Sequence, residues 1–149
     1  MDDDRRRPAI IALTALANSE DYHDRVDAGR ALASFADARE ARESLLRLVL
    51  DANDTFVTYA TAEALLRRHD LAGLAIIAEA LASADLQHRT YVGDAVAAVF
   101  TMFASERDRA VEACDELSLD ASAQVRQGSA ELRDMLTEIR PLLHPQEPA

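Results

Sequence analysis

Histidine and cysteine are the side chains from which a metal site or a reactive nucleophile would most readily be built. The chain has four histidines, at positions 23, 69, 88 and 144, and no two of them are four residues apart. It contains neither a His-Glu-x-x-His motif nor a Cys-x-x-Cys motif. The single cysteine, Cys114, stands among acidic residues in VEACDELS, which raises the pKa of a thiol and weakens it as a nucleophile. We therefore expect no metal site, and a buried structural role for Cys114.

Carboxylates are the other groups that supply acid–base chemistry, and the chain has 27 Asp and Glu residues. A catalytic pair needs a pocket that shifts the pKa values of its members, and nothing in the spacing of these residues indicates one. The chain also lacks a glycine-rich phosphate loop and a Gly-x-Ser-x-Gly motif. We predict no catalytic residue and no cofactor, with most carboxylates on solvated helix faces and at helix caps.

The charge of the chain indicates what kind of partner it can attract. The net charge is -11, and all 16 basic residues are arginines. Such a chain repels phosphate, so we predict no nucleic-acid partner and a basic protein as the partner. One cysteine cannot form an internal disulfide, which favours a reducing cytoplasm. The longest weakly polar run, 71–84, is too short to span a bilayer and contains Glu79, so we predict no membrane association.

Apolar residues recur at helical spacing along almost the whole chain, which contains only four Gly and four Pro residues. The spacing predicts eight helices, around residues 8–17, 26–35, 45–49, 55–68, 71–83, 86–104, 106–117 and 122–140. A single domain is predicted over 1–143, followed by a disordered tail over 144–149.

The ends of these helices have recognisable signals. Pro8 suits a first helical turn, Asp54 suits a cap, and Ser105 with Asp108 resembles a weakened capping box. The segment from Thr55 to Tyr59 is β-branched and aromatic like a strand. It leads directly into strong helix formers, so we predict that it forms the opening turns of a helix.

Every second predicted helix shares a short pattern. The segments DRVDAGRAL, VTYATAEAL, HRTYVGDAV and VRQGSAELR begin at residues 24, 57, 88 and 125, a spacing of 31 to 37 residues. Their second place is Arg in all but one, and their sixth place is always small. An aspartate precedes each of them. The second-place residues are Arg25, Thr58, Arg89 and Arg126, the sixth-place residues are Gly29, Ala62, Gly93 and Ala130, and the aspartates are Asp21, Asp51, Asp85 and Asp120.

This combination resembles the HEAT family, particularly its short HEAT-like variant of the bilin-lyase type. The best local matches are Asp120 with Val125 and Arg126, and Val57 with Ala62, Ala64 and Leu65. The resemblance implies an all-α fold, a right-handed α-solenoid of about four HEAT-like helical hairpins. It also implies that the second helix of each hairpin lines a concave binding surface. HEAT-like units occur in lyases that attach bilins and in DNA glycosylases as well, so the resemblance leaves an enzyme or ligand-binding accessory protein as the alternative.

The repeat alignment then selects candidate binding residues. The third, fourth and seventh places of the shared pattern, which include Val26, Ala60, Thr90, Gln127 and Gly128, should point outward on the concave side. From these places and the following turn we predict a partner-binding set made of Asp27, Arg30, Tyr59, Glu63, Arg67, Tyr91, Asp94 and Glu131. Tyrosines are efficient interface anchors and aligned carboxylates steer a basic partner, although both tyrosines also suit helix packing.

These features predict a non-catalytic protein-binding module, used as an adaptor or as an immunity or inhibitor protein against a basic nuclease toxin. A deep pocket with converging carboxylates and a histidine would favour the enzyme or ligand-binding alternative, and a shallow groove would favour protein binding. We expect a monomer or a weak homodimer. The apolar terminal helix, with Met135, Leu136, Ile139, Leu142 and Leu143, suits either a cap on the stack or self-association.

Overall fold

The computed structural model describes residues 3–145, which form eight α-helices and one short 3-10 helix. Their bounds are α1 Asp3–Ala17, α2 Tyr22–Leu32, η1 Ala33–Phe35, α3 Arg39–Val49, α4 Thr55–Leu66, α5 Leu71–Ser83, α6 Leu86–Phe100, α7 Ala104–Leu117 and α8 Ala123–Glu138. The β structure of the described residues is limited to one isolated bridge, between Phe103 and Leu143. The prediction of an all-α fold is confirmed. Of the tail predicted to be disordered, residues 146–149 lie outside the described part of the chain.

Short polar side chains begin most of the helices, as the sequence predicts. The Asp54 carboxylate accepts a hydrogen bond of 2.8 Å from the backbone N–H of Phe56, so the strand-like segment is the first turns of α4. Asp21, Asp70, Asp85 and Ser122 cap α2, α5, α6 and α8 in the same way. Each cap satisfies an amide that the helix itself leaves without a partner.

Two of the predicted helix starts are wrong. Helix α1 begins at Asp3, so Pro8 lies inside the helix rather than at its first residue. Helix α7 begins at Ala104, so Ser105 is already helical and does not cap it. The reason at α7 is tertiary, because the backbone N–H of Ala104 donates to the carbonyl of Leu143 at 2.9 Å and needs no serine. That carbonyl belongs to the C-terminal segment, which lies beside the α6–α7 connection.

Helix α5 is the centre of the molecule. It packs against α3, α4, α7 and, most extensively, α8. Its sequence, LAGLAIIAEALAS, is apolar on nearly every side, which is the pattern of a helix enclosed by others. Its polar exception, Glu79, is half-buried and accepts hydrogen bonds of 2.6 and 3.0 Å from the Arg42 guanidinium of α3.

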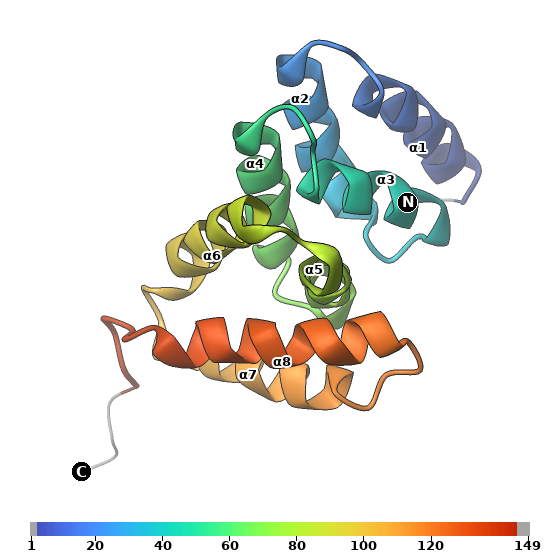
Figure 1. The fold of residues 1–149 in the computed structure, drawn as a ribbon. Helices are drawn as coiled ribbons and strands as arrows, with labels where there is room; N and C mark the ends of the chain where they lie inside the picture. The colour runs from blue at the N-terminus through green and yellow to red at the C-terminus, as the bar shows by residue number, and fades with distance from the viewer. Residues whose placement is uncertain (1–2, 146–149) are drawn as a thin grey trace.

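Helices α2, α4 and α6 lie side by side in one row, as the predicted hairpin stack requires (Figure 1). A Cβ added to Gly29 of α2 would stand 2.1 Å from the Thr61 hydroxyl oxygen of α4, so this small residue does permit close helix approach. Gly93 of α6 holds the same place in its segment but has no such close contact. The nearest neighbour of a Cβ there is the terminal methyl of Met135, at 4.0 Å.

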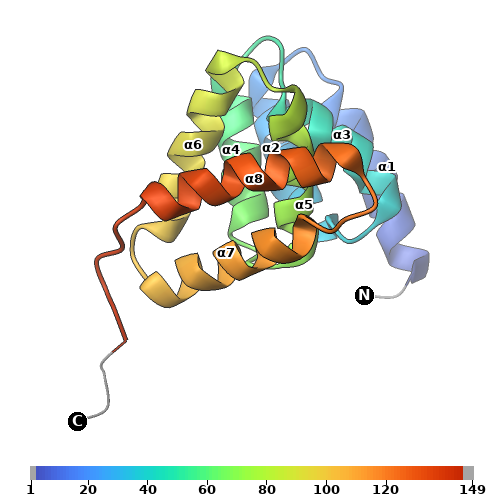
Figure 2. The ribbon, with the colours of Figure 1, turned by 60° about the horizontal axis from the view of Figure 1, so that its bottom comes forward.

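The last hairpin does not continue that row. Helix α8 crosses α5 and makes only limited contact with α6, as Figure 2 shows from a second direction. A Cβ added to Gly128 would stand 1.6 Å from the carbonyl oxygen of Ala78, so the two helix backbones touch at this point. The packing therefore follows the predicted stack for three hairpins, and a regular solenoid of four is not confirmed.

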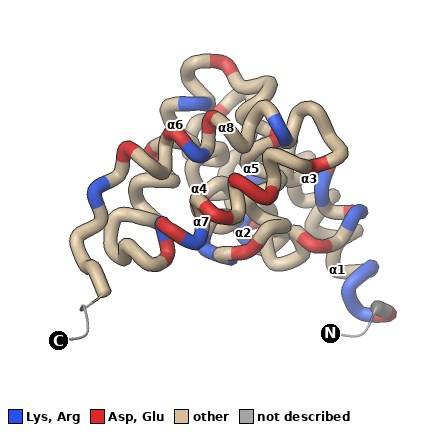
Figure 3. Tube along the Cα trace, turned by 90° about the horizontal axis from the view of Figure 1, so that it is seen from below, with Lys and Arg blue, Asp and Glu red and all other residues tan. Residues whose placement is uncertain are grey.

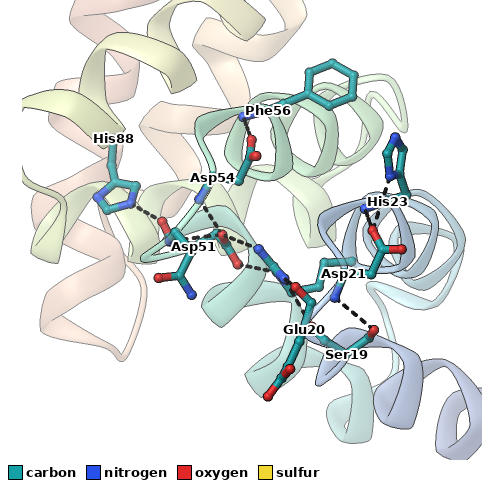
Figure 4. A network of polar contacts seen from close by, with 10 residues as sticks. Ser19, Glu20, Asp21, His23, Asp51, Asp54, Phe56 and His88 are labelled. Carbon is teal, nitrogen blue, oxygen red and sulfur yellow. Dashed lines mark hydrogen bonds and ion pairs between the residues drawn. The ribbon is translucent and has the colours of Figure 1, made fainter.

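A buried ion pair joins the first two hairpins (Figure 4). The Arg25 guanidinium donates to both carboxylate oxygens of Asp51, at 3.0 and 3.2 Å, and to the carbonyls of Ser19 and Glu20. Both charged side chains are only 9% exposed. Asp51 also accepts from the backbone N–H groups of Asn53 and Asp54, so its carboxylate shapes the turn before α4.

The same turn is linked to α6 through His88. One imidazole nitrogen of His88 lies 2.8 Å from the carbonyl oxygen of Asp51, and the other lies 2.8 Å from the Asp85 carboxylate. The backbone N–H of His88 is the main cause that lowers the pKa of Asp85 below its ordinary value. The turn after α3 thus connects three successive hairpins by polar contacts.

Candidate functional site

Exposed and half-buried side chains of α2, α4 and α6 form one continuous surface. The Arg30 guanidinium of α2 lies over the Phe56 ring of α4, 5.8 Å from its centroid. On α4, the Tyr59 hydroxyl donates to the Glu63 carboxylate at 3.1 Å, and Arg67 lies 3.5 Å from the same carboxylate. We call this surface the α4 face and define it as Asp27, Arg30, Phe56, Tyr59, Glu63, Arg67, Tyr91 and Asp94.

Helix geometry places the remaining members on the same side. Asp27 precedes Arg30 by one turn on α2, and Tyr91 precedes Asp94 by one turn on α6. The negative charge of Asp94 is near enough to contribute to the raised pKa of Tyr59. The α4 face is thus made of seven of the eight residues in the predicted binding set, together with Phe56.

The electrostatics of Tyr59 keep its hydroxyl protonated. Burial is the largest cause of its raised pKa, followed by the hydrogen bond to Glu63 and the negative charge of that residue. The neutral hydroxyl holds the carboxylate of Glu63 at the centre of the face. A fixed aromatic ring beside a fixed carboxylate suits a cation on a partner.

Glu131, the eighth predicted residue, is engaged elsewhere. Its carboxylate accepts a hydrogen bond from Arg89 of α6, and its helix, α8, packs on α5. The fourth acid of the predicted stripe is therefore paired within the chain, on a helix outside the row of α2, α4 and α6. Three residues predicted to point outward, Val26, Ala60 and Gly128, are buried, so the third and fourth places of the pattern do not face solvent in every repeat.

Charges of both signs share the molecular surface. Figure 3 shows acidic and basic segments interspersed over the helices rather than gathered in one stripe. On the α4 face, Glu63 has partners in Tyr59 and Arg67. Asp27 and Asp94 are exposed, and neither has a hydrogen-bonded or ionic partner among residues 3–145. These two carboxylates are the ones available to a partner.

Phe56 is a surface residue of the α4 face that the predicted binding set does not contain. It is 45% exposed and stands in the first turn of α4. The signal that identifies it is its position three residues before Tyr59, which puts both rings on one side of the helix. With Tyr59 and Tyr91 it gives the α4 face three aromatic rings.

A separate cavity of about 260 Å³ lies where the α4–α5 turn meets α6 and α7. Its walls include Leu74, Phe100 and Ala110, and its rim carries His69, Glu106 and Arg109. The His69 imidazole lies edge-on to the Phe100 ring, with centroids 5.6 Å apart, and 4.0 Å from the Glu106 carboxylate. The sequence reading gave no role to these residues, because they come from three elements that only the fold brings together.

Other chemistry is limited in the part of the chain that the structure describes. No group of three or more His, Cys, Asp or Glu side chains is arranged to hold a metal ion there. Cys114 is buried, as expected, and burial together with the charge of Asp115 raises its pKa to about 12. None of the described helices combines the length and the apolar character needed to cross a membrane.

No protein-family model and no curated protein matches the chain. Among solved structures, it is similar to a crystal structure of an engineered protein, with 21% sequence identity and a TM-score of 0.35. The match covers 87% of this chain and 62% of that one. A similarity at this level carries no argument about function.

Proposed function

We propose that the protein is a non-catalytic binding module of the HEAT-like kind, which engages a basic protein partner through the α4 face. The observation that carries this proposal is the cluster of Tyr59, Glu63 and Asp94 beside the Arg30–Phe56 pair. Aromatic rings provide contact area at low entropic cost, and unpaired carboxylates at their edge select a cationic partner. An immunity or inhibitor protein against a basic toxin in the cytoplasm, or an adaptor, would use such a surface.

The kinship with HEAT-like repeats is part of the proposal and rests on local geometry. Arg25 and Arg126 hold the second place of their segments, and each donates to the carbonyls five and six residues earlier. Helices α2 and α8 are thus joined to the turns before them by the same pair of arginine–carbonyl hydrogen bonds. The side-by-side row of α2, α4 and α6 supports the same kinship.

A charge-reversal experiment tests the binding surface. The tagged protein is used to capture partners from the native organism's lysate, in parallel with Asp27→Arg/Asp94→Arg and with a control pair, Glu112→Arg/Asp134→Arg. All four acids are exposed, and both pairs change the net charge equally. We expect the wild-type protein to capture a stoichiometric basic partner that is released at high salt. The Asp27→Arg/Asp94→Arg variant should not capture this partner, and the control variant should capture it as the wild type does. Retention by the first pair, or equal loss with both pairs, would contradict the assignment of the face.

A further inference from the structure

We propose that the cavity beside His69 is a binding site for a small carboxylate with an apolar or aromatic body. None of the residues of the α4 face lines it, so this inference is separate from the proposed protein binding. The cavity opens at the junction of the α4–α5 turn, the end of α6 and the first half of α7. Its lining divides into an apolar floor and a charged rim, and each part specifies one end of the ligand.

The floor suits a hydrocarbon group. Leu74, Phe100 and Ala110 are all less than 5% exposed, and Leu71 and Ala113 extend the apolar wall toward the opening. The volume of about 260 Å³ exceeds the ~150 Å³ that accommodates one benzene molecule in an apolar protein cavity. A phenyl ring with a short chain therefore fits, and a cofactor-sized molecule does not.

The rim favours an anionic ligand because its basic side chain, Arg109, has no ionic partner among the described residues. Within residues 3–145 the Arg109 guanidinium has no hydrogen-bond or ion-pair partner. One of the two acidic groups of the rim has a close ionic partner, and the other has a 4.0 Å contact with an imidazole. Asp70 accepts two hydrogen bonds from Arg68, at 3.2 and 2.7 Å, and caps α5, while Glu106 faces His69. A guanidinium with free donors binds a carboxylate in bidentate fashion, which fixes the orientation of the ligand.

His69 is held at the mouth by its backbone. It has a φ of 53°, in the left-handed region that a residue without glycine's freedom adopts at some cost. Arg68 and Asp70 secure the turn on both sides, since Arg68 also donates to the carbonyl of Ala33 at 3.0 Å. The imidazole lies against Phe100, with ring centroids 5.6 Å apart, and supplies a hydrogen-bonding group to the same rim as Arg109.

The test uses three probes of equal shape and different charge: phenylacetate, phenylacetamide and phenethylamine. Each is titrated into the ¹⁵N-labelled full chain while the backbone amide signals of His69, Phe100 and Ala110 are followed. We expect saturable shifts of these signals and an affinity for phenylacetate at least about tenfold above that for phenylacetamide. Arg109→Gln should remove the tenfold preference and leave phenylacetamide binding unchanged.

Two further variants separate the site from the fold. Arg47→Gln removes another exposed arginine, on α3, and should keep the wild-type preference. Ala113→Leu should fill the cavity and abolish binding of all three probes, with the unfolding transition checked by circular dichroism. The proposal is overturned if no signal saturates by about 10 mM probe, a concentration at which even millimolar binding shows. It is also overturned if the three probes bind equally or if phenethylamine binds best.

Discussion

At the scale of single residues, one sequence position has three different physical roles in this protein. Arg25, Arg89 and Arg126 occupy the second place of their segments. Arg25 is buried against Asp51, Arg89 pairs with Glu131, and Arg126 binds only backbone carbonyls at the surface. The exception, Thr58, is fully buried where a guanidinium would have no water and no acid to meet. Arg25 and Arg126 share the contact with the preceding turn, and their neighbours decide how much each arginine contributes to stability.

Arg25 and Arg126 allow a direct comparison of how much each arginine contributes to stability. Replacing Arg25 with Gln leaves the Asp51 carboxylate buried without its ionic partner, so we expect the free energy of unfolding to fall by about 3 kcal/mol. Replacing Arg126 with Gln removes exposed contacts and should cost within about 0.5 kcal/mol. Urea unfolding of both variants measures the difference. Equal losses would show that the Arg25–Asp51 pair does not join the hairpins as described.

Cys114, the single cysteine of the chain, reports on unfolding of the structure around it. Its buried thiol has a pKa raised to about 12, above the 9.0 of an exposed thiol. We expect no labelling by a thiol reagent in the native state at pH 8, and complete labelling once the chain unfolds. The sign of the linkage follows from the same shift. Above pH 9 the unfolded thiol releases its proton first, so this group lowers the stability of the fold as pH rises. Rapid native-state labelling would contradict the burial.

Tyr59 tests the electrostatics of the α4 face. Glu63→Gln removes a negative charge next to the hydroxyl, so the pKa of Tyr59 should move down toward 10.0 while burial keeps it raised. A ¹³C NMR titration of the Tyr59 ring separates it from the other two tyrosines. The control Asp134→Asn, on α8, should leave the Tyr59 curve in place. In the wild type, this group favours folding below pH 10 and ceases to do so as pH rises through its folded pKa.

At the scale of helices, small residues mark contacts in some places and not in others. Gly128 and Gly93 both stand inside helices, yet the first touches the backbone of α5 and the second faces only the end of Met135. Sequence shows the small residue in both cases. It does not show which helix lies opposite, and that decides whether the glycine is required.

The two glycines make a matched pair of substitutions. Gly128→Ala must push α8 away from Ala78, so we expect a loss of at least about 2 kcal/mol in unfolding free energy. Gly93→Ala has space and should stabilise α6 by about 0.5 to 1 kcal/mol through its helix propensity. Thermal unfolding of both variants checks whether their changes in stability have opposite signs. Destabilisation by Gly93→Ala would mean that α6 and α8 lie closer than described.

Helix starts show the limit of local signals in the same way. Asp54, Asp70 and Asp85 act on amides of their own turns, and for that reason they could be predicted from sequence. The start of α7 depends on a hydrogen bond from a segment about 40 residues later, which no local pattern contains. The α4 face was predictable because its members share a helix or a neighbouring helix. The His69 cavity was not, because its rim joins α7 to a turn far from it in sequence.

At the scale of the whole molecule, α8 crosses α5 instead of extending the row of α2, α4 and α6. In an array each hairpin touches only its neighbours, and stability is a sum along the chain. Here too the extensive contacts join neighbouring hairpins, but the last hairpin packs on α5 more than on α6, the last helix of the row. The repeat pattern in the sequence has no feature that distinguishes this crossing from a fourth regular layer. The packing of this last hairpin is the step at which a regular solenoid of four is not confirmed.

Truncation after Leu117 measures the consequence for cooperativity. Removing α8 uncovers α5 around Ala78, so we expect the remaining helices to lose a cooperative urea transition rather than to lose one repeat's share of stability. Removing α1 instead should be tolerated better, since α1 packs only on α2 and α3 to any extent. A truncated chain that unfolds cooperatively with a proportionally smaller denaturant slope would support the simple array.

The position of α8 also affects the order in which the chain can fold as it is synthesised. Helices α1 to α4 pack on one another, and α3 and α4 gain their remaining neighbours as soon as α5 and α6 follow. Helix α5 ends at Ser83, and the helix that covers it begins at Ala123, about 40 residues later. At roughly 5 to 20 residues per second, the ribosome takes about 2 to 8 seconds to supply it. During that interval an apolar helix stays open on the nascent chain, and a chaperone that binds hydrophobic segments has its best opportunity there.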